Sequence, residues 1–106
     1  MGVWYVDSVS PVLPTAYLAA GDRLSFFDDM VLELYNRWQH YFTTSNWMVL
    51  YDKVFKDHYL KLYGYDEYGE YVLILYGRIE ELTDTTMVLV DSDEETGVTY
   101  RAYLSR

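Results

Sequence analysis

The side chains best suited to chemistry in this chain are two histidines, several adjacent carboxylates and thirteen tyrosines. His40 and His58 are not spaced to bring two imidazoles to one metal ion. The adjacent carboxylates at 28–29, 80–81 and 93–95 point to opposite faces of a strand or into solvent from a turn. Neither arrangement gives the facing pair of carboxyl groups that glycoside hydrolysis requires. We therefore expect no catalytic site and no metal site.

Motifs for nucleophilic or nucleotide-dependent chemistry are also missing from the sequence. There is no G-x-S-x-G around a serine, no G-x-G-x-x-G and no P-loop, and the chain has no cysteine. The acidic segment 91–97 faintly resembles a calcium loop, but Thr96 stands where the loop needs glycine at its sixth position. A solvated hairpin loop accounts for it better. We expect a protein that is not an enzyme and has no cofactor.

The charge of the chain excludes two classes of partner. Eight basic residues stand against 17 acidic ones, which gives a formal net charge of −9. Such a charge opposes binding to nucleic acid and to anionic lipid heads. The longest apolar run, residues 72–76, is far shorter than the roughly 20 residues of a membrane-spanning helix. We expect no nucleic-acid partner and no membrane insertion of the chain.

Alternation of side chains predicts the fold. From residue 24 onward apolar residues alternate with polar or aromatic ones, and turn residues separate the segments. One domain, residues 1–106, is the simplest reading of this length. The pattern predicts an all-β antiparallel barrel or sandwich of about eight or nine short strands. The predicted strands are 3–10, 23–27, 30–35, 38–44, 47–51, 58–63, 71–80, 87–90 and 98–104, with turns at 28–29 and 44–46.

The predicted inward side chains are nearly all large. Such a set fills a short barrel and leaves little room for a ligand. It consists of Leu24, Phe26, Met30, Leu32, Leu34, Met48, Leu50, Leu60, Leu62, Met87 and Leu89.

Aromatic residues at the alternate positions form a predicted wall on the outside or at the mouth of the barrel. Aromatic rings with polar tips suit sugar stacking and protein interfaces. Cross-strand aromatic pairing, which only stabilises an exposed sheet, is the simpler explanation. The predicted wall consists of Tyr35, Tyr41, Trp47, Tyr51, Tyr59, Tyr63 and Tyr71.

Four segments resemble one family along most of the chain. Gly2-Val3-Trp4 resembles the G-x-W signature of lipocalin-like proteins, and L-T-D-T-T-M-V-L-V-D at 82–91 resembles a run near the end of their small relatives. Segments 23–35 and 41–50 resemble the hairpin and the strand between these signatures. The resemblance is to small lipocalin-like domains of cell-envelope lipoproteins from Bacteroides-type bacteria.

The resemblance implies an up-and-down barrel, an exported protein whose leader has been removed, and at most an undefined apolar ligand. It also implies that a basic residue of the last strand packs across Trp4. Arg101 is the first match for that residue and Arg106 the second.

These observations predict a non-catalytic binding or structural module of an exported bacterial envelope protein, periplasmic or at the cell surface. Its partner would be a glycan, a small apolar ligand or a protein. The alternative is an acidic inhibitor or nucleic-acid mimic that occupies a basic groove of its target. The residues alone leave a cytoplasmic location open.

Overall fold

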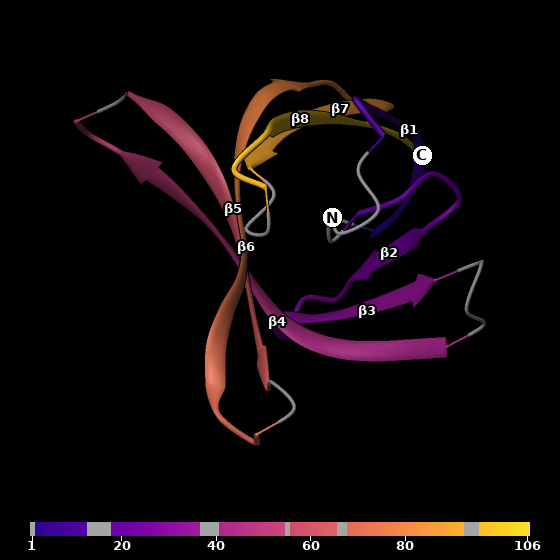
Figure 1. Ribbon diagram of the computed structural model, residues 1–106, viewed down its shortest axis with the longest axis vertical. Coiled ribbons are helices and arrows are strands. Elements are labelled where there is room, and N and C mark those ends of the chain that lie inside the picture. Colours follow the sequence, from indigo (N-terminus) through magenta and orange to yellow (C-terminus); the bar gives the residue numbers. More distant parts are fainter. Residues whose placement is uncertain (1, 13–17, 37–40, 55, 66–67, 93–95) are drawn as a thin grey trace.

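Eight antiparallel strands follow one another around a closed barrel, and β8 pairs with β1 to complete it (Figure 1). The structure, a computed structural model, describes residues 2–12, 18–36, 41–54, 56–65, 68–92 and 96–106. The predicted all-β up-and-down barrel is confirmed. The strands are β1 (Gly2–Ser10), β2 (Arg23–Phe26), β3 (Val31–Asn36), β4 (Tyr41–Asp52), β5 (Asp57–Tyr65), β6 (Tyr71–Leu82), β7 (Thr86–Ser92) and β8 (Thr99–Ser105).

The tight turn predicted at 28–29 is confirmed. The Asp29 carboxylate accepts a hydrogen bond from the Val31 amide at 3.2 Å, and the Met30 amide donates to the Phe27 carbonyl at 3.2 Å. Met30 takes a positive φ of 65° to close the turn. Because it belongs to the turn, Met30 is exposed, and its predicted inward position is wrong.

The turn predicted at 44–46 does not exist, because β4 runs through it. Thr44, Ser45 and Asn46 pair with Glu33, Leu32 and Val31 of β3. Their backbone groups are satisfied by this ladder, so the segment stays extended. Two predicted strands are therefore one strand of 12 residues, and the barrel has eight strands.

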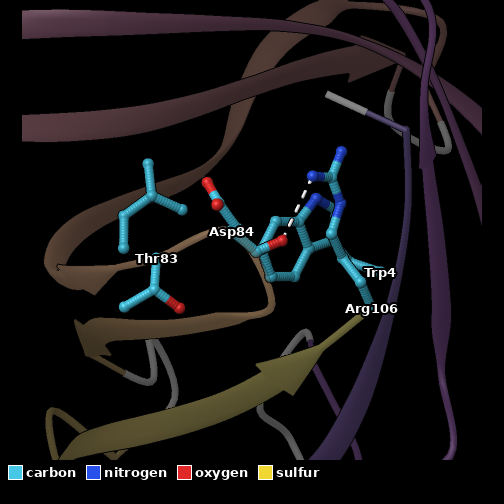
Figure 2. Close-up of a pocket in the computed structure, with 5 residues that line it drawn as sticks. Trp4, Thr83, Asp84 and Arg106 are labelled. Carbon is cyan, nitrogen blue, oxygen red and sulfur yellow. Dashed lines mark hydrogen bonds between the residues drawn. The ribbon is translucent and has the colours of Figure 1, made fainter.

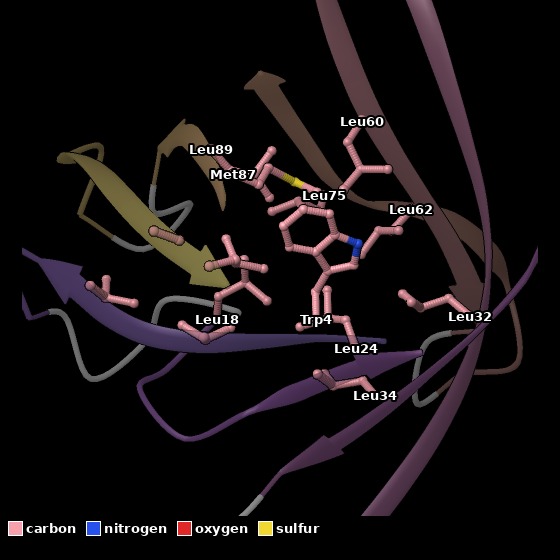
Figure 3. Close-up of a cluster of buried hydrophobic side chains, with 14 of the residues drawn as sticks. Trp4, Leu18, Leu24, Leu32, Leu34, Leu60, Leu62, Leu75, Met87 and Leu89 are labelled. Atoms are coloured by element: carbon pink, nitrogen blue, oxygen red, sulfur yellow. The ribbon is translucent and has the colours of Figure 1, made fainter. Parts of the chain in front are cut away.

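Large apolar side chains occupy the barrel interior, with Trp4 among them (Figure 3). Leu24, Leu32, Leu60 and Leu62 have no exposed surface. Each such side chain stabilises the fold by roughly 1.5–3 kcal/mol on burial. The members of the predicted inward set found buried are Leu24, Phe26, Leu32, Leu34, Leu60, Leu62, Met87 and Leu89.

The predicted inward positions of Met48 and Leu50 in β4 are wrong, because the side chains that point inward are those of the alternate residues. Trp47 pairs with Leu62 and Val49 with Leu60. Directly paired residues share a face, so Trp47 and Val49 lie on the inward face. Met48 and Leu50 therefore lie on the outer face, and both are partly or largely exposed.

Two hairpins project from the barrel on either side of the point where β5 and β6 cross (Figure 1). One is formed by β4 and β5, which stay paired out to Asp52 and Asp57. The other is formed by β5 and β6, which stay paired out to Tyr65 and Tyr71. In the described pairings, β7 pairs with β6 only from Arg78 onward, so residues 71–77 have a strand on one side only.

Candidate binding surface

Five tyrosines gather on the outer face of β5 and β6, and we call them the tyrosine face. Because Leu60, Leu62 and Gly64 point inward, the residues between them on β5 point outward. On β6 a bulge beside Leu62 and Tyr63 inserts one extra residue, which keeps tyrosines outward on both sides of it. The members of the tyrosine face are Tyr59, Tyr63, Tyr65, Tyr71 and Tyr76.

The rings of the tyrosine face pack mainly against one another. Tyr59 and Tyr76 are stacked with their centroids 4.5 Å apart and an interplanar angle of 17°. Tyr63 and Tyr71 are stacked at 5.8 Å and 6°, and Tyr65 meets Tyr71 edge-on at 5.2 Å. These contacts join β5 to β6, and Tyr65, Tyr71 and Tyr76 remain 74%, 50% and 39% exposed.

Polar neighbours fix two of these rings. The Tyr71 hydroxyl donates to the Asn46 Oδ1 atom of β4 at 2.7 Å. The Lys61 ammonium lies over the Tyr76 ring, 5.0 Å from its centroid. The pKa of Tyr59 is raised above its ordinary value of 10.0, first by desolvation and then by nearby Tyr76, Asp57 and Asp52. The Tyr59 hydroxyl therefore remains a hydrogen-bond donor at neutral pH.

The predicted aromatic wall does not form one surface. Among its members with described side chains, Tyr59, Tyr63 and Tyr71 share the tyrosine face, and the others lie elsewhere. Tyr35 lies on β3 under the Arg23 guanidinium, 5.2 Å from its ring centroid. Tyr51 lies on the opposite face of β4–β5 and contacts the His58 ring at 4.9 Å.

Trp47 is the clearest departure from the predicted wall, because its ring points inward. It meets Phe26 edge-on with centroids 5.2 Å apart, and its indole N–H donates to the Phe27 carbonyl at 3.0 Å. Tyr41 belongs to β4, but its side chain lies outside the described part of the structure.

Sequence reasoning missed Tyr65 and Tyr76. Tyr65 lies beyond the predicted strand 58–63, whereas β5 extends to include it. Tyr76 and Tyr71 differ by an odd number of positions, so strict alternation places them on opposite faces. The bulge in β6 restores them to one face, and because no glycine stands at residues 73–75, opposite the register shift, the sequence carries no clear sign of it.

At one end of the barrel, Arg106 and not Arg101 lies across Trp4. The Arg106 guanidinium is 5.0 Å from the indole centroid and donates to the Asp84 carbonyl at 3.2 Å (Figure 2). Gly2, at φ 80°, leaves room for it, since a Cβ there would lie 3.0 Å from the guanidinium Nη2 atom. A surface hollow of about 410 Å³ opens beside this contact, lined by Trp4, Leu82, Thr83, Asp84 and Arg106.

Arg101 has a different partner on the outer face of the barrel. Its Nε and Nη2 atoms donate to the two Glu80 oxygens at 3.1 and 3.1 Å, and Arg78 donates to the same carboxylate at 3.3 Å. The hydrogen bonds from Arg101 are the main cause that lowers the pKa of Glu80 below its ordinary value. The prediction that Arg101 covers Trp4 is wrong, because β8 turns Arg101 outward between the buried Tyr100 and Ala102.

Comparisons with protein-family models, curated proteins and solved structures find no match for this chain. Its function must therefore be argued from the described geometry.

One buried carboxyl group lies directly before β2. Asp22 has no exposed surface, and one of its oxygens accepts from the Ala19 amide at 3.0 Å. Its other oxygen, Oδ1, has no hydrogen-bond partner in the described part of the chain. Burial raises the pKa of Asp22 above its ordinary value, although the Ala19 amide acts in the opposite direction.

Two further carboxylates serve local structure. Asp52 accepts from the Val54 amide at 2.8 Å, and Asp91 accepts from the Tyr100 hydroxyl at 3.0 Å. Among the described residues, no three histidine or carboxylate side chains are grouped as metal ligands, and no helix is long and apolar enough to span a membrane. The tyrosine face is the strongest candidate surface for a functional contact.

Proposed function

We propose that this chain is a non-catalytic binding module that contacts another protein through its tyrosine face. The supporting observation is the exposed ladder of stacked tyrosines on a hairpin that projects from the barrel. Tyrosine combines a rigid apolar ring with a polar tip, and it is enriched at protein interfaces. Exposed apolar surface gathered on one side of a protein commonly marks such a contact.

The ring geometry favours a protein over a glycan. Sugars bind aromatic residues by lying on the open face of a ring. One face of Tyr76 is taken by Tyr59 and the ring is also covered by Lys61, while Tyr71 is packed by Tyr63 and Tyr65. What this surface offers is partly exposed tyrosine side chains that already pack against one another, which suit the mixed apolar and polar contacts of a protein interface.

The other predicted occupants gain less support. Large side chains pack together in the barrel interior, which disfavours a small apolar ligand there. An acidic mimic of nucleic acid would need carboxylates in rows spaced like phosphates. The described acids are instead spread over turns and over several strands, as at Asp28, Asp84 and Glu33, and Glu80 is paired with arginine.

The proposal is tested by selecting binders from a displayed library of proteins encoded by the source organism, with a glycan array in parallel. Tyr71→Ala should weaken a selected protein by roughly tenfold or more, as expected for a central interface tyrosine. Tyr103→Ala, on the outer face of β8 and also exposed, is the matched control and should leave binding unchanged. Binders insensitive to Tyr71→Ala, or glycan binding that depends on it, would contradict the proposal.

Membership of an exported envelope protein is a further part of the proposal, and it rests on the family resemblance alone. A lipoprotein cleavage site encoded upstream of Gly2 would support export. A different coding context, such as an upstream domain of cytoplasmic type, would contradict it.

A further inference from the structure

One edge of the projecting β4–β5 hairpin is open. β3 pairs with β4 only as far as Asn46, whereas β5 pairs with β4 out to Asp52. In the described part of the chain, residues 48–52 have no strand on their other side. Three side chains in the middle of this segment are apolar and exposed: 38% of Val49, 41% of Leu50 and 52% of Tyr51 is accessible. An exposed apolar edge of this kind readily pairs with another strand.

The direction of the backbone groups along this edge follows from one hydrogen bond. The Trp47 amide donates to the Met30 carbonyl at 2.9 Å, so the polar groups of Trp47 point to the open side of β4. Along a strand, the N–H and C=O groups of successive residues point alternately to one side of the strand and to the other. The N–H and C=O groups of Val49 and Tyr51 therefore face the open edge, while those of Met48 and Leu50 face β5.

We propose that this edge pairs with the same edge of a second copy of the chain, antiparallel about a twofold axis at Leu50. In this register Val49 of each copy lies opposite Tyr51 of the other, and the outward backbone groups of both residues face each other. Leu50 meets Leu50 across the axis at a pair of residues without mutual hydrogen bonds, where side chains approach most closely. Both faces of the sheet continue unbroken, because paired residues come from the same face.

The length of the open edge fits this occupant. At one end the edge is closed by Met30, which already bonds to Trp47, and at the other it ends where the chain turns at Lys53. A second copy presents a segment of the same length between the same two limits. Beta-branched and aromatic residues, here Val49 and Tyr51, form favourable cross-strand pairs.

Charge complementarity also favours a second copy. The proposed register brings Lys53 of one copy beside the turn that contains Asp28 and Asp29 in the other. All three lysines of the chain, Lys53, Lys56 and Lys61, lie on the β4–β5 hairpin, although the whole chain carries −9. Repulsion between two such chains is long-range and is screened beyond about 8 Å at physiological salt, whereas close opposite charges are screened less.

The open edge of β6 fits a partner strand less well. Residues 71–77 also lack a second neighbour among the described pairings, but the bulge opposite Leu62 and Tyr63 interrupts their regular spacing. Bulges protect sheet edges from pairing. β4 has no register shift between Asn46 and Asp52, so it offers the regular edge.

The first experiment measures the mass of the whole chain in solution by sedimentation equilibrium, over a range from about 1 μM to about 1 mM that covers weak dimers. The wild-type chain should reach the dimer mass within this range. Leu50→Lys should weaken dimerisation by roughly tenfold or more, because two ammonium groups would meet at the axis. Leu73→Lys is the matched control, since Leu73 is also 41% exposed on an outer face and should leave the dimer intact. A monomeric wild-type chain, or equal loss in both variants, would overturn the proposal.

Hydrogen exchange gives a second readout that needs no substitution. Raising the protein concentration should slow exchange at the Val49 and Tyr51 amides, whereas the Met48 and Leu50 amides are already bonded to β5 and should not change. Protection that appears at the β6 edge instead, or at none of these amides while a dimer is present, would show that the dimer forms elsewhere.

A charge exchange tests the register. Lys53→Glu should weaken the dimer, and adding Asp28→Lys to it should restore the affinity. Asp28 is preferred to Asp29 because the Asp29 carboxylate holds its turn through Val31. If Leu50→Lys disrupts the dimer but the double variant does not regain the wild-type affinity, the antiparallel register is rejected. The outcome does not depend on the tyrosine face, so failure of either proposal leaves the other open to its own test.

Discussion

Leu62 and Leu73 offer a direct test of the packed barrel, since they are the same residue type on neighbouring strands. Leu62 has no exposed surface and pairs with the buried Leu75 and with Trp47, whereas Leu73 is 41% exposed on the outer face. Truncating a fully buried leucine removes its burial energy and leaves a cavity, at a cost of about 2–5 kcal/mol. We expect Leu62→Ala to lower the free energy of unfolding by about 3 kcal/mol.

Leu73→Ala should cost about 1 kcal/mol or less, because its side chain is only partly removed from water on folding. For a protein whose total stability is of the order of 5–15 kcal/mol, the difference between the two variants is large. Urea unfolding followed by far-UV circular dichroism, at a protein concentration low enough to avoid association, measures both. Unchanged m-values would show that the unfolded states are comparable. Equal losses in the two variants would refute the packed interior and the strand faces on which it depends.

Three further predictions concern charged groups. Because burial raises the pKa of Asp22, the protonated form of this carboxyl is favoured in the folded protein. Asp22 therefore stabilises the fold below pH 3.8, and this stabilisation is lost as pH rises through the raised pKa. Asp22→Asn should remove this dependence of the free energy of unfolding on pH, measured by urea unfolding, and an unchanged dependence would contradict it. Arg101→Gln should raise the pKa of Glu80 toward its ordinary value, as measured by NMR titration of its carboxyl carbon, whereas an unmoved titration would show that Arg78 dominates. The stabilisation from Glu80 is present above its ordinary pKa and is lost as pH falls through the lowered one. Arg106→Ala should cost about 0.5–1 kcal/mol and speed exchange of the Trp4 indole N–H, and wild-type exchange in the variant would argue against the cover.

The barrel class could be predicted from sequence because alternation and turn residues agree over most strands. At residues 24–34 and 60–62, polar or small residues between the leucines mark which face is buried. Residues 47–51, by contrast, are all apolar, and the pattern there is the same for either face. Only the pairing of β4 with Leu60 and Leu62 decides which face of residues 47–51 points inward, and this pairing is a long-range property. The predicted outward position of Trp47 and the predicted inward position of Leu50 are therefore both wrong.

The candidate site was predictable only in part for related reasons. Tyr59, Tyr63 and Tyr71 share one outer face, and of these three Tyr63 and Tyr71 stack on each other. The bulge that adds Tyr76 depends on how β6 bends between β5 and β7, not on a local residue preference. Whether Arg101 or Arg106 covers Trp4 depends on how far a side chain extends from the end of β8. The alternation of residues does not give this distance.

The stacked tyrosines of the hairpin and the tryptophans of the barrel interior give the molecule two optical reporters. The coupled rings of Tyr59 and Tyr76 contribute to near-ultraviolet dichroism from the hairpin, while Trp4 and Trp47 emit fluorescence from within the barrel. A hairpin outside the barrel buries little apolar surface, so it opens at lower free energy than the barrel. Heating should therefore reduce the tyrosine signal before the tryptophan emission shifts, and the spectrum of a single sample would resolve local opening from global unfolding.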